Sequence, residues 1–137
     1  MSSYVPKLDR VGEDVVLTYL ITATVTTGAV TDISTVTDSF NGETFTQHIM
    51  GKSLKVVEAY PTAGGTAPDA ADVTVKQNGL DLLGGFGVNL IHATATKSTY
   101  PRIDGQAVTY PIKDTLTIGV TNNIASLANF TIRLTFI

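Results

Sequence analysis

The sequence predicts an all-β protein, an antiparallel β-sandwich or small barrel of about seven or eight short strands with no significant helix. Three observations support this fold class. Apolar and polar residues alternate with a period of two in several segments, and no segment keeps the 3.6-residue apolar period of a helix. Threonine, valine and isoleucine, which favour strands, are frequent, and glycine, asparagine, aspartate and proline residues mark turns between the alternating segments.

The length of 137 residues fits one domain with a core and is too short for two comfortable ones. Residues 1–14 mix Pro6, Gly12 and several charged side chains with little periodicity. We therefore expect an N-terminal arm there that orders against a neighbour, with a disordered leader as the alternative. A single β-sandwich domain is expected to follow over residues 15–137.

The longest expected strand covers residues 15–26 and alternates apolar residues with threonines, as a half-buried strand does. Its expected inward residues are Val15, Leu17, Tyr19, Ile21, Ala23 and Val25.

Shorter strands are expected near residues 33–37, 43–49 and 53–60, with a tight turn at Asn41-Gly42. In the last of these strands, Glu58 shares a face with Leu54, Val56 and Tyr60, a position that alternation does not explain. Residues 61–71 predict a loop.

A β-hairpin is predicted at residues 72–83. Its turn is Asn78-Gly79, the dipeptide that a two-residue type I′ turn prefers because both central residues need a positive φ. The register pairs Gln77 with Leu80 and turns one apolar face of the hairpin toward the core.

Three glycines, Gly84, Gly85 and Gly87, surround Phe86 directly after this hairpin. Such a run predicts a corner or bulge, where the chain bends or another backbone approaches closely. It does not have the spacing of a phosphate-binding loop, and residues 88–96 are too rich in threonine and β-branched residues for a helix. We expect residues 88–96 to be extended.

The C-terminal third predicts three further strands. Residues 107–112 form a short one, which Pro111 places at a sheet edge. Residues 114–122 and 128–137 form two more, separated by a turn at Asn122-Asn123. The expected inward residues of these two strands are Leu116, Ile118, Val120, Phe130, Ile132, Leu134 and Phe136.

No cluster of residues predicts catalysis, a cofactor or a metal ion. The two histidines, His48 and His92, lie far apart and lack metal-binding spacing, and the chain has no cysteine. Asp69 and Asp72 could hold calcium together with loop carbonyls, but the Asp-x-Asp spacing is absent. We therefore expect no enzyme and no cofactor.

Charge and hydropathy limit the kinds of partner that the protein can have. A net charge of −3 and nine scattered Lys and Arg residues argue against nucleic-acid binding. The longest apolar-looking stretch, residues 15–25, alternates with threonine, so no membrane span is expected. Only 15% of the residues are charged, which predicts that a partner covers part of the surface and that the protein assembles with itself.

The order of five segments resembles a group of small virion proteins of tailed bacteriophages. The segments are ITATVTTGAVTDI, SLKVVEAYPT, GGTAPDAADVTV, NGLDLLGGFGVNLIHATATKSTYP and DTLTIGVTNN, followed by an apolar last strand. The resemblance covers about residues 16–137, and its most specific part is the succession D-V-T-V, x-G-L-D-L-L-G-G, G-V-N, A-T-A-T and Y-P. It implies a head decoration (cement) or head-fibre component, a β-sandwich that acts as an oligomer on a capsid without a catalytic motif.

From this resemblance we expect a homotrimer that binds the major capsid protein on the outer head surface, made in the host bacterial cytoplasm and located in the virion. The arm lies outside the resemblance, and we expect separately that its Tyr4, Val5 and Leu8 contact the shell.

A tail, neck or fibre component is the alternative within the virion. A carbohydrate-binding, adhesin-like β-sandwich module is the alternative from another class, with Tyr60, Tyr100 and Tyr110 as its candidate aromatic residues.

Overall fold

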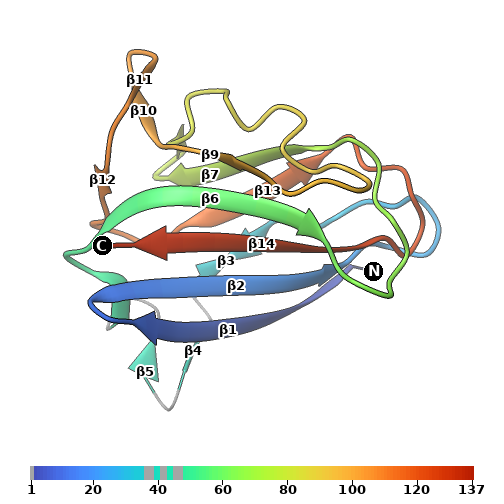
Figure 1. Ribbon diagram of the computed structural model, residues 1–137, viewed down its shortest axis with the longest axis horizontal. Helices are drawn as coiled ribbons and strands as arrows, with labels where there is room; N and C mark the ends of the chain where they lie inside the picture. Colours follow the sequence, from blue (N-terminus) through green and yellow to red (C-terminus); the bar gives the residue numbers. More distant parts are fainter. Residues whose placement is uncertain (1, 36–38, 41–42, 45–47) are drawn as a thin grey trace.

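The structure, a computed structural model that describes residues 2–35, 39–40, 43–44 and 48–137, is all-β and consists of two stacked antiparallel sheets with two small hairpins (Figure 1). The predicted fold class is confirmed, although the strands outnumber eight because several are pairs of two-residue segments. In the part of the chain that the structure describes, no helix is long and apolar enough to cross a membrane. The strands are β1 (Ser3–Val11), β2 (Asp14–Thr22), β3 (Ile33–Ser34), β4 (Ser39–Phe40), β5 (Glu43–Thr44), β6 (Ser53–Pro61), β7 (Asp72–Gln77), β8 (Leu80–Asp81), β9 (Lys97–Thr99), β10 (Arg102–Ile103), β11 (Gln106–Ala107), β12 (Tyr110–Pro111), β13 (Thr117–Thr121) and β14 (Asn129–Phe136).

The larger sheet has the strand order β1-β2-β14-β6-β12, and β9 also pairs with β6. The C-terminal strand β14 lies between β2 and β6, antiparallel to both, so the last residues of the chain are tied down on two sides. Pro111 lies in β12 at the end of this sheet, as expected for a residue that cannot donate to a neighbouring strand.

The smaller sheet, with the order β3-β13-β7-β8, lies behind the larger one in Figure 1. The connections from β2 to β3, β6 to β7, β8 to β9, β12 to β13 and β13 to β14 all pass from one sheet to the other. The two C-terminal strands therefore contribute to opposite sheets.

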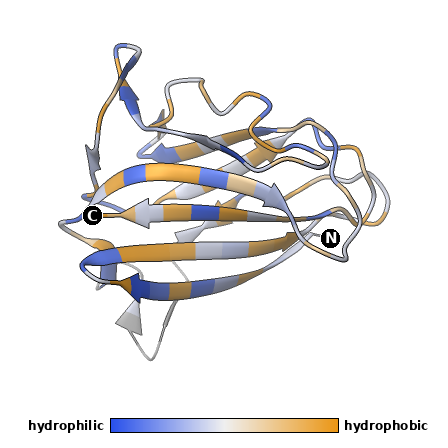
Figure 2. Cartoon of the chain, in the orientation of Figure 1, coloured by the Kyte–Doolittle hydropathy of each residue, from blue (hydrophilic) through white to orange (hydrophobic). Residues whose placement is uncertain are grey.

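The core fills the space between the two inner faces. Figure 2 shows the alternation of hydrophilic and hydrophobic residues along β14 that produces one buried and one outer face. The expected inward residues of β2, β13 and β14 are all buried, whereas Val25, just beyond β2, is exposed. The largest fully buried side chains are Tyr19, Phe130, Phe136, Leu17, Ile21, Ile33, Ile49, Leu54, Leu82, Leu83 and Ile91.

The N-terminal segment is a strand of this sheet, so the prediction of a separate arm over residues 1–14 is wrong. Strand β1 pairs with β2 along its whole length, from Ser3 opposite Thr22 to Val11 opposite Asp14. Its alternating Tyr4, Pro6 and Leu8 are partly buried while their neighbours are exposed, a period of two that the charged residues concealed.

Strand β6 contains a bulge that explains the position of Glu58. Thr135 of β14 pairs with Val56 and Phe136 pairs with Leu54, so Lys55 has no partner in this register. One extra residue reverses the alternation, and Leu54 faces the core while the later even-numbered residues face outward. The expectation that Leu54 shares their face is therefore wrong. These outward residues are Val56, Glu58 and Tyr60.

The hairpin β7–β8 has the predicted turn and register. Asn78 has a φ of 51° and Gly79 a φ of 83°, as a type I′ turn requires, and Gln77 pairs with Leu80. The return strand ends at Asp81, two residues earlier than predicted.

The carboxylate of Asp81 stabilises the turn at which the strand ends. Its oxygens accept the backbone N–H groups of Val75 at 3.2 Å, Leu83 at 3.1 Å and Gly85 at 3.0 Å. The bonds from Leu83 and Gly85 hold the turn that follows β8, the bond from Val75 ties the carboxylate to β7, and charge-assisted bonds of this kind are stronger than neutral ones.

The glycine corner consists of Gly84, Gly85 and Gly87. Gly84 and Gly85 have positive φ angles of 59° and 84°. At Gly87 a Cβ would overlap the carbonyl oxygen of Val73, whose N–H donates to the Gly87 oxygen at 2.9 Å. The corner thus contains both the bend and the close backbone approach.

Two other segments differ from the expectations. Residues 88–96 form no strand and contribute only an isolated bridge between Ala71 and Ile91, because the glycine corner leads the chain into consecutive turns. The expected turn at Asn41-Gly42 lies outside the described residues, as do residues 45–47 of the strand expected over 43–49, whereas Glu43 and Thr44 form β5 and pair with β4. His48 and Ile49, at its end, are helical.

The alternation along β1 can be tested by truncating neighbouring side chains. Tyr4→Ala should lower the free energy of unfolding by about 2 kcal/mol or more, because its ring packs edge-on against Tyr19 with centroids 5.5 Å apart. Val5→Ala should change it by less than about 0.5 kcal/mol, because Val5 is 60% exposed. Chemical denaturation measures both, and equal costs would contradict the strand.

The glycine corner predicts an order of effects for two Gly→Ala variants. Gly79→Ala should cost about 1 to 3 kcal/mol, since positive φ strains an alanine although the space around it is open. Gly87→Ala should cost more, because the new methyl group must displace the backbone of Val73 and weaken its hydrogen bond. Urea unfolding of both variants checks this order, and a tolerated Gly87→Ala would refute the close approach.

Candidate functional site

The two histidines serve local structure. The Nδ1 atom of His92 accepts the backbone N–H groups of Thr94 and Ala95, each at 3.1 Å. His48 lies 3.1 Å from the guanidinium of Arg10 on β1. Each histidine therefore has a partner of its own, in a separate part of the fold.

The two aspartates considered for calcium bind amide groups. Asp69 accepts the backbone N–H of Ile124 at 3.1 Å, and Asp72 accepts the backbone N–H of Asn89 at 2.8 Å and the side-chain amide of Asn122 at 2.6 Å. Among the described residues, no group of three or more His, Cys, Asp or Glu side chains could hold a metal ion. These carboxylates hold loops against the end of the sandwich.

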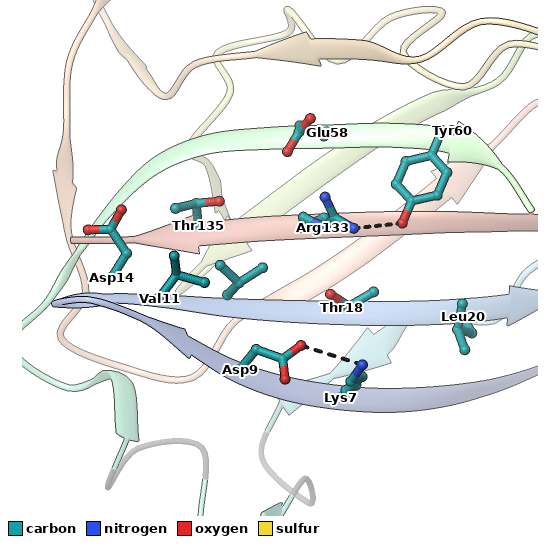
Figure 3. A pocket seen from close by; sticks show the side chains of 11 residues that line it. Lys7, Asp9, Val11, Asp14, Thr18, Leu20, Glu58, Tyr60, Arg133 and Thr135 are labelled. Atoms are coloured by element: carbon teal, nitrogen blue, oxygen red, sulfur yellow. Dashed lines mark hydrogen bonds and ion pairs between the residues drawn. The ribbon is translucent and has the colours of Figure 1, made fainter.

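A hollow of about 550 Å³ lies on the outer face of the larger sheet, the face that points away from the core (Figure 3). Its volume is within the range of about 300 to 1,000 Å³ common for small-molecule sites. We call it the outer hollow. It is lined by Lys7, Asp9, Val11, Asp14, Val16, Thr18, Leu20, Glu58, Tyr60, Arg133 and Thr135.

Strand register explains how residues far apart in the sequence meet in the outer hollow. Lys7 pairs with Thr18, Thr18 with Arg133, and Arg133 with Glu58, so these four residues form one row across β1, β2, β14 and β6. Neighbouring rows bring Leu20 and Tyr60 to one side of it and Asp9 and Thr135 to the other.

Arg133 is held in place by Tyr60. Its Nη2 donates to the Tyr60 hydroxyl at 2.9 Å, and its guanidinium carbon lies 5.3 Å from the centroid of the tyrosine ring. The hydrogen bond and the cation–π contact together restrict a side chain that otherwise has many rotamers. Arg133 still has guanidinium donors to offer to a ligand, since one hydrogen bond uses one of its five N–H groups.

Glu58 lies beside Arg133 and has no hydrogen-bond or ion-pair partner among the residues that the structure describes. Lys7 and Asp9 form an ion pair at 3.6 Å on the opposite wall, with both side chains largely open to solvent. The outer hollow therefore combines two cations with three carboxylates, Asp14 included, and can form hydrogen bonds in both directions.

The three tyrosines considered for carbohydrate binding lie in different places. Tyr60 contributes to the outer hollow. Tyr100 is exposed after β9, and Tyr110 in β12 packs partly against the core. Tyr60 thus lies in a concave polar environment, and the three tyrosines do not form one site.

The residues predicted to contact a capsid are split by the pleat of β1. Tyr4 and Leu8 pack against the core, so neither is available to a partner while the strand is paired. Val5 lies on the outer face and is exposed.

Exposed apolar residues gather instead at one end of the sandwich, where the loops after β2 and β13 meet. Val25, Ile124 and Leu127 are 58%, 76% and 47% exposed. We call these three residues the apolar tip. Val25 was expected to face inward, and neither Ile124 nor Leu127 was predicted to be exposed beside it, because nothing in residues 23–30 or 122–128 shows that the two loops are neighbours.

The chain matches no protein-family model, no curated protein and no solved structure.

Proposed function

We propose that the protein is a structural component of a tailed-bacteriophage virion, a decoration (cement) protein that binds the major capsid protein on the outer head surface. The resemblance of residues 16–137 to small phage virion proteins supports this proposal. The structural observation that carries it is the apolar tip, which gives the protein an adhesive surface. A protein with only 15% charged residues has limited means to keep such a surface soluble unless a partner covers it.

The apolar tip is held rigidly by backbone hydrogen bonds between its two loops. The N–H of Ala23 donates to the oxygen of Ala128 at 2.9 Å, and the N–H of Leu127 donates to the oxygen of Thr24 at 3.1 Å. A surface fixed before binding loses little conformational entropy when it docks.

A buried amide and a tightly packed glycine add to this rigidity. Asn123 donates from Nδ2 to the oxygen of Gly28 at 2.6 Å in a buried position. Gly28 has a φ of 70° and lies against the backbone of Ile124 and Ala125, where a Cβ would clash. The two loops therefore present the apolar tip as one unit.

The proposed mechanism is adhesion repeated over a symmetric lattice. Burying apolar area contributes about 25 cal/mol per Å² before the costs of association, so one small surface gives modest affinity. Several tips in one oligomer, each on an equivalent capsid site, would bind with much higher avidity. The same apolar tip would also serve a tail, neck or fibre component, which remains the alternative within the virion.

The apolar tip can be tested with particles assembled without this protein. We expect such particles to release DNA at a lower temperature than complete ones, and added wild-type protein to restore them. The double variant Ile124→Ser/Leu127→Ser should bind particles at least about tenfold more weakly and fail to restore them, because it loses apolar contact area. Co-sedimentation and dye-detected DNA release are the measurements.

The matched control is Val88→Ser/Ile103→Ser, which removes two apolar side chains that are 62% and 50% exposed elsewhere on the protein. The control should bind and restore particles as the wild-type protein does. Both double variants should unfold at the same thermal midpoint as the wild-type protein. Full binding by the tip variant would contradict the assigned contact. Absence of binding by the wild-type protein would contradict the capsid proposal itself.

The proposed homotrimer predicts a particular mass in solution. Multi-angle light scattering on the purified protein should give three chains of 14.5 kDa each, because oligomerisation covers exposed apolar surface on a weakly charged protein. A monomer at every concentration tested would contradict the trimer. Capsid binding would then need the shell itself to organise the copies.

A further inference from the structure

The outer hollow has no role in the proposed capsid contact. It lies on the broad outer face of the larger sheet, whereas the apolar tip lies on loops at one end of the sandwich. A site on the face and a contact at the end can be occupied at the same time. Ligand binding in the outer hollow would therefore be independent of the proposed virion function.

The lining of the outer hollow argues against two classes of ligand. Its charged residues are two cations and three carboxylates, so a polyanion such as nucleic acid would meet more repulsion than attraction. Its floor carries Thr18, Arg133 and Thr135, which an apolar ligand would leave without hydrogen-bond partners. The ligand should be polar and close to neutral.

The lining also matches the hydrogen-bonding character of a sugar. Glu58 and Asp9 accept hydrogen bonds, Arg133 and Lys7 donate them, and Thr18 does both. Sugar hydroxyl groups likewise donate and accept, so each can find a partner among these alternating groups. The arrangement differs from a site for a simple ion, which would need groups of one charge.

Tyr60 adds an apolar surface at one side of this polar row. In Figure 3 its ring faces away from the sheet, next to the guanidinium of Arg133. The C–H groups on the flat side of a pyranose carry a small positive charge and pack well on the negative face of an aromatic ring. One aromatic ring beside polar groups of both kinds is suited to a sugar ring.

From these observations we propose that the outer hollow binds a short neutral oligosaccharide, with one sugar against Tyr60 and its hydroxyl groups bonded to Glu58 and Arg133. A second copy of the chain is a poor occupant, because two equivalent concave faces leave a gap between them. The hydrogen bond from Arg133 to Tyr60 fixes both groups before the ligand arrives, which reduces the entropy lost on binding.

The test is a nuclear magnetic resonance titration of the full-length ¹⁵N-labelled protein. The probes are three neutral trisaccharides, maltotriose, cellotriose and N,N′,N″-triacetylchitotriose, with trigalacturonic acid as the anionic comparison. At least one neutral probe should shift amide signals of β6 and β14 around Glu58 and Arg133 and saturate below about 10 mM, as weak single-site sugar binding does. The anionic probe should bind at least tenfold more weakly than that neutral probe.

Two variants and one control locate the site. Tyr60→Ala and Glu58→Ala should each weaken the binding at least tenfold. Lys55→Ala, an exposed residue of the same strand outside the hollow, should leave it within twofold. If loss of the Arg133 bond unfolds Tyr60→Ala, Glu58→Ala decides, since no hydrogen bond in the described structure depends on its carboxylate.

Three results with the neutral probes would overturn the proposal. They are the absence of shifts with all three neutral probes at 10 mM, shifts confined to other surfaces, and unchanged affinity in the folded variants. Tighter binding of the anionic probe would also overturn it, because the lining would then select charge and not hydroxyl groups. The particle-binding experiments do not involve these probes, so either proposal can fail without the other.

Discussion

The central position of β14 is the constraint on which the rest of the larger sheet depends. On one side this strand pairs with β2, which lies more than a hundred residues earlier in the sequence. On the other side it pairs with β6, from the middle of the chain. Its inner residues, such as Phe130 and Phe136, complete the core. Its outer residue Arg133 joins Thr18 to Glu58, so the outer hollow exists only once the C-terminus is in place. Such long-range pairing pays loop-closure entropy before it gains contacts, which favours slow folding.

Alternation predicted which side chains are buried because it is a local property of each strand. The buried residues of β2, β13 and β14 follow from it directly, and so does the Asn78-Gly79 turn. Alternation does not predict the order of the strands in a sheet, since any apolar face can pack against another. The outer hollow was therefore missed, although Glu58 gave a signal. Alternation left the position of Glu58 on an apparently apolar face unexplained, and the structure explains it by a bulge at the unpaired Lys55.

Side chains that could perform chemistry are largely occupied with backbone amides. Asp81 accepts hydrogen bonds from three backbone N–H groups where β8 ends. Asp69 and Asp72 each accept a backbone N–H from a neighbouring loop. A short polar side chain at a turn often has this use, since turns leave backbone donors without partners. Composition could not separate these carboxylates from Glu58. Their difference lies in hydrogen bonding, which the fold determines.

The edge strand of the larger sheet limits how copies of this protein can assemble. Strand β1 is the last strand of the sheet on its side, and an open edge invites pairing with another chain. Pro6 lacks an N–H to donate, and Lys7, Asp9 and Arg10 place charges along the same strand, features that natural edge strands use against such pairing. Assembly by continuing the sheet is therefore disfavoured. The apolar tip offers contact of another kind, through apolar side chains on two loops whose backbones bond to each other at Ala23, Thr24, Leu127 and Ala128.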